Sequence, residues 1–588
     1  MDRRLDRNGT EVILANRQRG RIKPLLTPGL MWLAPLGFLA LFYFYPLSSI
    51  LQVSFARGES GWMGALLDTL ASRSTYQVLS FTIWQAVLST LLTLAIGLPG
   101  AYLFARYQFP GKSLLQALTT IPFVMPTLVV AAAFNSLLGP RGWLNLGLMQ
   151  LFGLAEPPLV LTNSLVAILL AHVFYNTTIV LRMVGDFWSH IDPRLVQAAQ
   201  VLGANRWRTF WQVTVPLLLP AISAAALLVF IFDFSSFGVI LLLGGPRFAT
   251  LEVEIYTQTI SLFNLPVAAS LAVIQLACTL GLTIAYTRLS NRVSRPLSLR
   301  PKTYTQERVV SWRARLFAGG ILVLLLTLFI LPLASLALRS VTHLESNRLD
   351  SQPIQRGLTL DFYRELSINR RQSMFYAPPS AAIGLSLGYA SATVLLSLLL
   401  GLPAAWSLAR SVKNPFNRLM DPLLMLPLGT SAVTLGLGFI IALNQPPLDL
   451  RNSWALIPLA HTLVAFPFVV RSLTPALRSI RPQLHQAAAT LGASPGTVFR
   501  TIDLPLVGRS LLVAAVFAFT ISLGEFGATA LIARPEYPTV PVAIYRFISQ
   551  PGAMNYGQAL ALSTLLMLIT SIGILLIERL RIAEVGEF

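Results

Sequence analysis

Charged residues are scarce in this sequence. Of 588 residues only 12% are Asp, Glu, Lys or Arg, whereas 54% are hydrophobic, and soluble domains carry about a quarter charged residues. An ordinary water-soluble enzyme is therefore excluded, as is intrinsic disorder, which requires low hydrophobicity. The net charge of +20 is typical of chains that bind nucleic acid or a membrane surface. The apolar content decides for the membrane, so we expect no nucleic-acid partner.

Cysteine and clustered histidine are almost missing as well. The single cysteine, Cys278, excludes an intramolecular disulfide and a CxxC metal site. The five histidines are scattered along the chain, so we expect no metal and no cofactor. For His172 and His461, which occupy equivalent positions in the repeat described below, a packed and hydrogen-bonded role is favoured over a ligand role.

A nucleotide-binding loop is also lacking. The only Gly-Lys-Ser triplet stands at 111–113, and five positions before Gly111 the chain has Arg106. A phosphate-binding loop of the form GxxxxGK[ST] requires glycine there. The chain alone is therefore not expected to hydrolyse ATP or to be an enzyme.

Long apolar segments make up most of the chain. A helix needs about 20 mostly apolar residues to cross the hydrocarbon core of a membrane. The segments here are continuous and rich in Leu and Ala, unlike the alternating strands of a membrane barrel. We expect an all-α polytopic membrane protein with about twelve transmembrane helices, at 29–51, 80–104, 114–138, 158–184, 217–243, 267–287, 317–338, 381–408, 419–443, 454–471, 506–532 and 558–578.

The basic residues indicate an orientation. Residues 1–28 are polar and basic, too long and too charged for a simple signal-peptide start, so we expect a retained N-terminal tail. With this tail in the cytoplasm, the cytoplasmic segments hold roughly twice as many Lys and Arg as the outer loops. The pattern favours a multi-pass protein whose N- and C-termini are both cytoplasmic.

The second half of the chain repeats the first. Gly97-Leu98-Pro99 recurs at 401–403, an offset of 304, and Ala171-His172 recurs at 460–461, an offset of 289 that then continues without a gap. Both halves start inside, so we expect parallel repeats related by an axis along the membrane normal. The expected organisation is a tail (1–28), a first transmembrane domain (29–287), a basic cytoplasmic linker (288–316), a second transmembrane domain (317–578) and a C-terminal tail (579–588).

Two long cytoplasmic loops, 185–216 and 472–505, carry the most specific motif. Each has a proline where a short helix would begin, then Gln-Ala-Ala, then a glycine where the helix would end, and finally a proline before the next span. Small residues let the backbone of a partner approach, whereas the alternative is a helix lying on the lipid. The duplication at identical spacing favours the partner-binding alternative. The residues are Gln197, Ala198, Ala199, Gly203 and Pro216 in the first loop and Gln486, Ala487, Ala488, Gly492 and Pro505 in the second.

These spacings resemble the E-A-A-x3-G-x9-I-x-L-P loop of ABC importer permeases. Both copies have Gln in place of the frequent Glu, and the first copy also has Val at the Ile and Leu positions. The runs 168–176, 242–256 and 522–527 make the chain most similar to the fused, two-domain permeases for thiamine and ferric iron. The resemblance implies the type I importer permease fold, a bacterial inner-membrane location, two ATP-binding cassette subunits on these loops, and a periplasmic or lipid-anchored solute-binding protein.

One acid lies inside the fifth span of each half. Ionisable groups within spans are costly and usually face a pathway. Asp233 lies in span 217–243 and Glu525 in span 506–532, where the offset of 289 pairs Glu525 with Ser236. We expect Asp233, Ser236 and Glu525 to face a translocation pathway; the alternative is local pairing with Arg247 or Arg534. Two negative groups suit a cation, and thiamine and ferric iron are both cations.

A twelve-helix secondary transporter is the competing function, since such proteins also consist of parallel halves. Major-facilitator proteins carry a G-x-x-x-D-R-x-G-R type loop after the second span, whereas 105–113 reads ARYQFPGKS. Duplicated Gln-Ala-Ala loops would also have no purpose in such a transporter. The sequence therefore favours the permease subunit of an ATP-driven importer.

Overall fold

The computed structural model describes residues 28–55, 69–293, 306–343, 357–368, 378–410, 414–444, 446 and 448–585. Nearly all of the predicted N-terminal tail, the middle of the predicted linker and the last three residues lie outside these ranges. Within them, ten helices are long and apolar enough to cross a membrane, and two bent helix pairs bring the number to twelve if each pair is one span. The predicted all-α architecture with about twelve spans is confirmed.

The first half of the chain is mainly helical in its described part, with π-helical turns at Ala40–Phe44, Phe210–Thr214 and Thr257–Ser261 and a 3-10 turn at Gly245–Arg247. Its α-helices are α1 (Pro28–Leu39), α2 (Tyr45–Phe55), α4 (Arg73–Arg106), α5 (Lys112–Val124), α6 (Thr127–Leu138), α7 (Trp143–Phe152), α8 (Leu165–Ser189), α9 (Pro193–Val201), α10 (Arg206–Thr209), α11 (Val215–Phe234), α12 (Gly238–Leu243), α13 (Leu251–Tyr256) and α14 (Leu265–Val293).

The second half follows the same order, with a π-helical turn at Phe499–Asp503 and 3-10 turns at Glu365–Ser367 and Leu426–Gly429. Its α-helices are α15 (Trp312–Ser340), α16 (Asp361–Arg364), α17 (Pro379–Arg410), α18 (Pro415–Met425), α19 (Ala432–Ala442), α20 (Leu456–Ser479), α21 (Pro482–Thr490), α22 (Pro495–Val498), α23 (Leu504–Gly524), α24 (Gly527–Ile532), α25 (Val540–Ile548) and α26 (Ala553–Val585).

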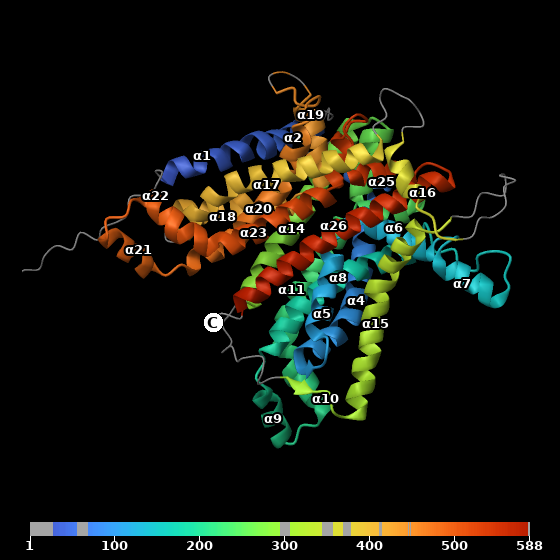
Figure 1. Cartoon of the computed structure of the whole chain (residues 1–588), viewed down its shortest axis with the longest axis horizontal. Helices are drawn as coiled ribbons and strands as arrows, with labels where there is room; N and C mark the ends of the chain where they lie inside the picture. The colour runs from blue at the N-terminus through green and yellow to red at the C-terminus, as the bar shows by residue number, and fades with distance from the viewer. Residues whose placement is uncertain are drawn as a thin grey trace, which may run out of the picture.

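The helices form two arms that meet at one end of the molecule (Figure 1). In each half one long helix pair forms the centre of an arm: α4 packs along α8, and α17 packs along α20. The first helices cross between halves, since α1 packs on α17, α2 on α19, and α15 on α6. The short helices α9 and α21 lie at the free tips of different arms (Figure 1). The two halves therefore interlock near one face and separate toward the other.

Four predicted spans are not straight helices. The spans at 114–138 and 419–443 are bent by 106° and 94°. In the first, Pro126 holds the preceding Met125 in an extended conformation because a proline disfavours helical geometry one residue earlier. In the second, Ser431 is extended and caps α19 through the amide of Thr434. Each bent span leaves a helix end inside the bundle.

The fifth span of each half is broken where we expected continuity. Helix α11 ends at Phe234 and α12 begins at Gly238, while α23 ends at Gly524 and α24 begins at Gly527. These spans also begin earlier than expected, at Arg206 and Gly496. Pro216 and Pro505 consequently lie inside a continuous helix rather than at its start. A π-helical turn precedes each of them, which makes room for the proline ring and its missing amide donor.

The predicted linker is partly ordered structure. Helix α14 extends to Val293, and strand β2 (Glu307–Arg308) pairs in parallel with β1 (Tyr107–Gln108), which follows α4. The register places Tyr107 opposite Glu307. The segment that leads into the second half is therefore attached to the first half just after the C-terminal end of α4.

Candidate functional site

The first Gln-Ala-Ala loop folds as a short helix, α9. Asp192 caps it by accepting a hydrogen bond from the Arg194 amide at 3.0 Å, and Pro193 occupies the first helical position. Gly203 follows the helix with a φ of +90°, a left-handed conformation in which residues with a Cβ are strained. The predicted helix start at Pro193 and the helix end marked by Gly203 are both confirmed.

The second loop repeats this design in α21. Pro482 again occupies the first helical position, and Gly492 follows the helix with a φ of +74°. The amide of Gly492 donates to the Ala489 carbonyl, and the amide of Ala493 donates to the Ala488 carbonyl. Matching backbone bonds close the first helix at Gly203 and Ala204. The two copies thus share backbone geometry as well as sequence spacing.

Large apolar side chains stand exposed around both loops. Val201 and Leu202 at the end of α9 are 86% and 88% exposed, and Leu491 at the end of α21 is 86% exposed. Trp207, in α10 at the start of the fifth span, is 70% exposed. Large exposed apolar side chains at the tip of an arm are typical of surfaces that contact another molecule. The Gln-Ala-Ala residues therefore lie within a surface suited to a partner.

The second loop is anchored by a charged network around Asp503. Asp503, only 2% exposed, accepts from Arg410 at 3.0 Å and lies 2.6 Å from Nε2 of His485 on α21. Arg410 in turn stacks over Trp406 at 4.3 Å. By the repeat offsets, Asp503 corresponds to Thr214 and His485 to Val196. Around the first loop the corresponding packing is aromatic: Tyr102 contacts Trp188, and Phe210 stacks on Trp207.

The breaks in the two fifth spans meet at the centre of the molecule. Phe237 and Phe526, equivalent across the repeat, stack with ring centroids 5.3 Å apart and an interplanar angle of 20°. Each also contacts an equivalent tyrosine, Phe237 with Tyr256 at 5.4 Å and Phe526 with Tyr545 at 5.6 Å. We call these four residues the central aromatic stack. Because it joins equivalent positions, the pseudo-twofold axis passes between the two phenylalanines.

Behind the stack, Asp233 belongs to a buried polar cluster of the first half. It is fully buried; its Oδ1 accepts from Asn176 at 2.7 Å and lies 3.3 Å from Nδ1 of His172. Nε2 of His172 lies 2.9 Å from the Ser236 hydroxyl. Gln85 donates to the Asp233 carbonyl at 2.7 Å. The histidine thus joins the last residues of α11 to the break that follows.

The second half contains the same cluster with the acid moved. His461 lies 2.7 Å from the Ser522 hydroxyl and 3.3 Å from Glu525. Glu525 also caps α24, accepting from the amides of Ala528 at 2.8 Å and Thr529 at 3.1 Å. At an offset of 289, Ser522 corresponds to Asp233 and Glu525 to Ser236. Acid and serine have exchanged positions around an unchanged histidine.

The structure therefore brings Asp233 and Ser236 together, and it places Glu525 in the matching cluster. The local partners are Asn176 and His172 for Asp233 and His461 for Glu525, rather than Arg247 or Arg534. The hydrogen-bonded histidine role expected from the sequence is confirmed. The pathway role of the acids stays a prediction, since Asp233 is fully buried and Glu525 is 7% exposed.

Further equivalent bonds support the repeat alignment. The amide of Leu251 donates to Thr82 at 3.1 Å, and the amide of Val540, its equivalent, donates to Ser386 at 2.8 Å. Ser386 lies within a G-x-S-x-G run at 384–388, but this run is inside the long helix α17. A nucleophile of that motif needs a sharp strand-to-helix turn, so the run is structural here.

Two functional candidates escaped the sequence reasoning. Glu252 on α13 is 2% exposed and accepts from Gln275 at 3.3 Å; it was missed because it lies outside the predicted spans. Arg182 bonds Glu578 at 3.2 Å, which joins α8 of the first half to α26 of the second. Residues 396 positions apart give no periodic signal, so this pair could not be read from the sequence.

The sequence matches the model of one known protein family. The model of the family described as "Binding-protein-dependent transport system inner membrane component" matches twice, at residues 94–295 and 374–581. The two matches cover more than half of the chain and fall one in each half, in agreement with the repeat.

Similar curated proteins match along nearly the whole chain. The thiamine transport system permease protein ThiP of Escherichia coli is 27% identical, over 91% of this chain and 95% of its own length. The ThiP protein of Brucella abortus is 28% identical, over 93% and 94%. A probable ABC transporter permease protein of Sinorhizobium fredii is 25% identical, over 93% and 95%.

Among solved structures, a bacterial ABC transporter involved in the import of the acidic polysaccharide alginate matches with a TM-score of 0.39 and 18% identity. The match covers 45% of this chain and 96% of that one.

Proposed function

The chain belongs to the family of binding-protein-dependent transport system inner membrane components, and we propose that it forms the translocation pathway of an ATP-driven importer for thiamine. It is a multi-pass inner-membrane protein and a transport subunit. The observation that carries the proposal is the pair of Gln-Ala-Ala helices, α9 and α21, built alike at the free tips of the two arms. ATP hydrolysis is assigned to separate subunits.

Each Gln-Ala-Ala helix is proposed to hold one ATP-binding cassette subunit. The exposed Leu202 and Leu491 supply apolar contact, and the alanines allow close approach. Substituting Ala198 or Ala487 by Trp should weaken copurification of the cassette subunit about tenfold, because an inserted indole blocks the approach. Trp at exposed Leu331, in the part of α15 that is farther from the first loop, is the matched control. Unchanged copurification in both loop variants would contradict the assignment.

Thiamine is proposed as the solute because two relatives that match over more than 90% of this chain are named thiamine transport system permeases. The acids Asp233 and Glu525 also suit a cation. The test is uptake into proteoliposomes that contain this chain, its cassette subunit and its binding protein. We expect ATP-dependent uptake of labelled thiamine that excess ferric iron does not reduce. Uptake of ferric iron without thiamine uptake would overturn the substrate while leaving the importer assignment intact.

Asp233, Ser236 and Glu525 are proposed to act in translocation through the broken fifth spans. Their clusters hold the residues on either side of each break, and the central aromatic stack lies at those breaks. Asp233→Asn and Glu525→Gln keep the shape but remove the charge. We expect assembled complex at near-normal levels and transport per complex reduced at least fivefold. Normal transport per assembled complex in the double variant would show that the acids serve packing alone.

The two domains are proposed as 29–287 and 317–578, joined by the linker 288–316, with tails 1–28 and 579–588 in the cytoplasm. The support is the excess of basic residues in the cytoplasmic segments and the strand pairing of the linker beside α4. A reporter enzyme that is active only outside the membrane, fused after residue 588, should be inactive, whereas the same reporter in the loop at 139–157 should be active. The reverse result would invert the orientation.

A further inference from the structure

Helix α7 stands out from the bundle although its side chains are apolar. Leu151 is 75% exposed, and Trp143 and Leu144 are exposed as well. The run 142–155, which includes the whole helix, contains no charged residue. In Figure 1, α7 projects sideways from the end of the molecule where the arms join. Exposed apolar surface of this kind is typical of a contact with another molecule or with a membrane.

The exposed side chains share one face of α7. Trp143, Gly147 and Leu151 follow one another at intervals of four residues, and Leu144 precedes Leu151 by seven. Positions at these spacings lie on the same side of a helix. We call these four residues the α7 face. Asn145 belongs to the opposite side and is fully buried, so the helix turns its polar side chain inward and its apolar face outward.

Asn145 fixes the helix in this orientation. Its side-chain amide donates to the carbonyls of Gly139 at 2.9 Å and Leu159 at 2.8 Å, and its Oδ1 accepts from the Leu159 amide at 3.0 Å. In the turn before α7, a Cβ on Gly142 would lie 2.5 Å from the carbonyl oxygen of Leu137, so this close approach requires glycine. The α7 face is therefore held outward by directed bonds and a tight turn.

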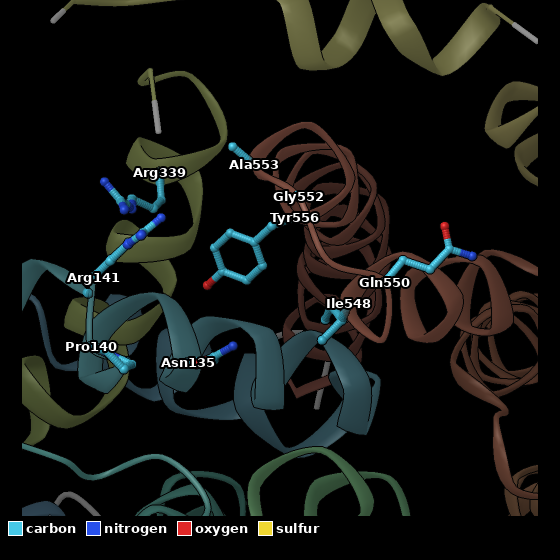
Figure 2. A pocket seen from close by; sticks show the side chains of 11 residues that line it. Asn135, Pro140, Arg141, Arg339, Ile548, Gln550, Gly552, Ala553 and Tyr556 are labelled. Atoms are coloured by element: carbon cyan, nitrogen blue, oxygen red, sulfur yellow. The ribbon is translucent and has the colours of Figure 1, made fainter. Parts of the chain in front are cut away.

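Charged residues flank α7 at both ends. Arg141, in the turn before the helix, is exposed and lines a cavity of about 310 Å³ between the two halves, together with Asn135 and Pro140 (Figure 2). Glu156, which follows the helix, is also exposed. Trp143 occupies the first helical position. Charged and aromatic residues at the ends of an apolar segment are typical of the boundary between membrane and water.

The α7 face is present in one half only. The first half joins α6 to α8 through residues 139–164, whereas the second joins α19 to α20 through the shorter segment 443–455. In its described residues, 443–444, 446 and 448–455, that segment contains no helix. It is also charged, with Asp449 and an exposed Arg451.

We propose that the α7 face lies in the outer leaflet of the membrane, where the lipid headgroups meet the acyl chains. The segment Thr127–Phe152 is, together with Lys112–Val124, long and apolar enough for a membrane span, so α7 continues the apolar segment that contains α6. Interfaces between proteins carry many hydrogen bonds, whereas the indole N–H of Trp143 is the one polar side-chain group of this face. An indole suits the headgroup boundary because its ring is apolar and its N–H is polar. The choice of leaflet follows from the orientation proposed above.

The lipid contact bears on how the halves are held together. Helix α6 is buried along almost its whole length and packs on α15 of the second half. Because α7 follows α6 after a tight turn, attachment of α7 to the membrane fixes the outer end of one helix of this contact. The first half thereby has a lipid attachment to which the second half offers no counterpart in its described residues.

The test measures lipid contact in the full complex, reconstituted in nanodiscs. On a Cys278→Ser background, Leu151→Cys is labelled with bimane, and the lipid contains phosphatidylcholine with a nitroxide on the upper part of an acyl chain as quencher. Asn452→Cys, at an exposed position of the corresponding segment in the second half, is the matched control. We expect lipid quenching at least about threefold stronger for Leu151→Cys than for the control, since an interfacial helix buries its apolar face at this depth. Iodide, a water-soluble quencher, should give the reverse order.

A second variant tests the apolar character of the face. With bimane at Leu144→Cys, the added substitution Leu151→Asp should lower lipid quenching by about half, because a carboxylate is costly among acyl chains. Unchanged quenching in this variant, or equal lipid quenching at Leu151→Cys and Asn452→Cys, overturns the proposal.

Protection from both quenchers also overturns the proposal, because a protein would then cover the face. Chains cross-linked in pairs by a bismaleimide at Leu151→Cys would identify a second copy of this chain. Protection that appears only after addition of the solute-binding protein would identify that protein. Thiamine uptake by the same labelled complex is measured separately, and its absence while lipid quenching persists would refute the transport function alone.

Discussion

The two Gln-Ala-Ala loops have one backbone design and two kinds of anchor. In both, a proline starts the helix and a left-handed glycine follows its end. The second helix is tied to its arm by Asp503, which bonds Arg410 and His485. The first has Thr214 and Val196 at the corresponding positions, and aromatic contacts of Tyr102 with Trp188 and of Phe210 with Trp207 lie around it. The loop geometry is thus kept while its attachment differs.

This difference indicates that the motif requires the backbone geometry of the helix but tolerates different contacts between the helix and its arm. In the proposed docking of a cassette subunit on each helix, the partner surface sets the backbone shape, so both copies keep it. The connection from the helix to the arm can be ionic or aromatic, provided that motion of the cassette subunit reaches the fifth span. Directed bonds such as the Asp503 network transmit a displacement with less slack than ring contacts do. We therefore expect the second loop to be the stiffer of the two.

The largest effect is expected from Asp503→Asn. Losing a hydrogen bond to a charged group costs about 1.5–3 kcal/mol, so binding-protein-stimulated ATPase activity should fall roughly tenfold. Thr214→Asn at the equivalent position should change it less than twofold. The measurement is stimulated ATPase activity per assembled complex. Equal losses at the two positions would show that the loops are anchored with the same strength.

The next effect concerns the central aromatic stack, where the halves should behave alike. Phe237→Ala and Phe526→Ala each remove one ring of the same stacked pair, an interaction of about 0.5–1.5 kcal/mol beyond buried area. Both should raise ATPase activity without binding protein several-fold and by similar factors. Because the rings contact each other, the double variant should add little to either single one. Additive effects would mean that the rings act separately.

The smallest effect is expected from Gly203→Ala and Gly492→Ala. A Cβ at either glycine meets nothing within 4 Å, so only the left-handed backbone opposes it, at about 1–2 kcal/mol. The melting temperature of the complex should fall by about 1–3 °C in each variant. The decrease should be the same in both loops, although the contacts that attach the two helices differ. A shift confined to one loop would indicate that its glycine also contacts the partner.

Much of the fold follows from composition and periodicity. Apolar segments long enough to span a membrane predict the number of helices, and the constant offset predicts the repeat. The breaks after Phe234 and Gly524 fall in the runs 233–238 (DFSSFG) and 522–527 (SLGEFG), which contain an acid, serine and glycine. These runs were a usable signal, but the apolar length of the whole segment favoured one continuous span. The bends at Pro126 and Ser431 had weak signals, since prolines occur in many other spans of this chain.

The candidate site was predictable in part for the same reason. Local spacing reveals the Gln-Ala-Ala helices, which depend on residues within about 20 positions. The histidine partners of Asp233 and Glu525 lie some 60 positions away in the sequence, and hydrophobic periodicity gives no information on contacts over that separation. The offset of 289 does align His172 with His461 and Asp233 with Ser522. This alignment, compared residue by residue, shows that the acid and the serine have exchanged positions, so the exchange could have been predicted from the sequence.

The ordered connection between β2 and β1 has a consequence for how the halves diverge. A covalent tether raises the effective concentration of one half near the other to the order of millimolar, so each half meets its fixed counterpart and not a copy of itself. A substitution in one half then does not require the equivalent substitution in the other half. The Arg182–Glu578 bond illustrates this freedom, since the offset puts Leu289 where the mirrored acid would stand. The fusion of both halves in one chain thus fixes their ratio at one to one and allows each half to have its own specialised surface.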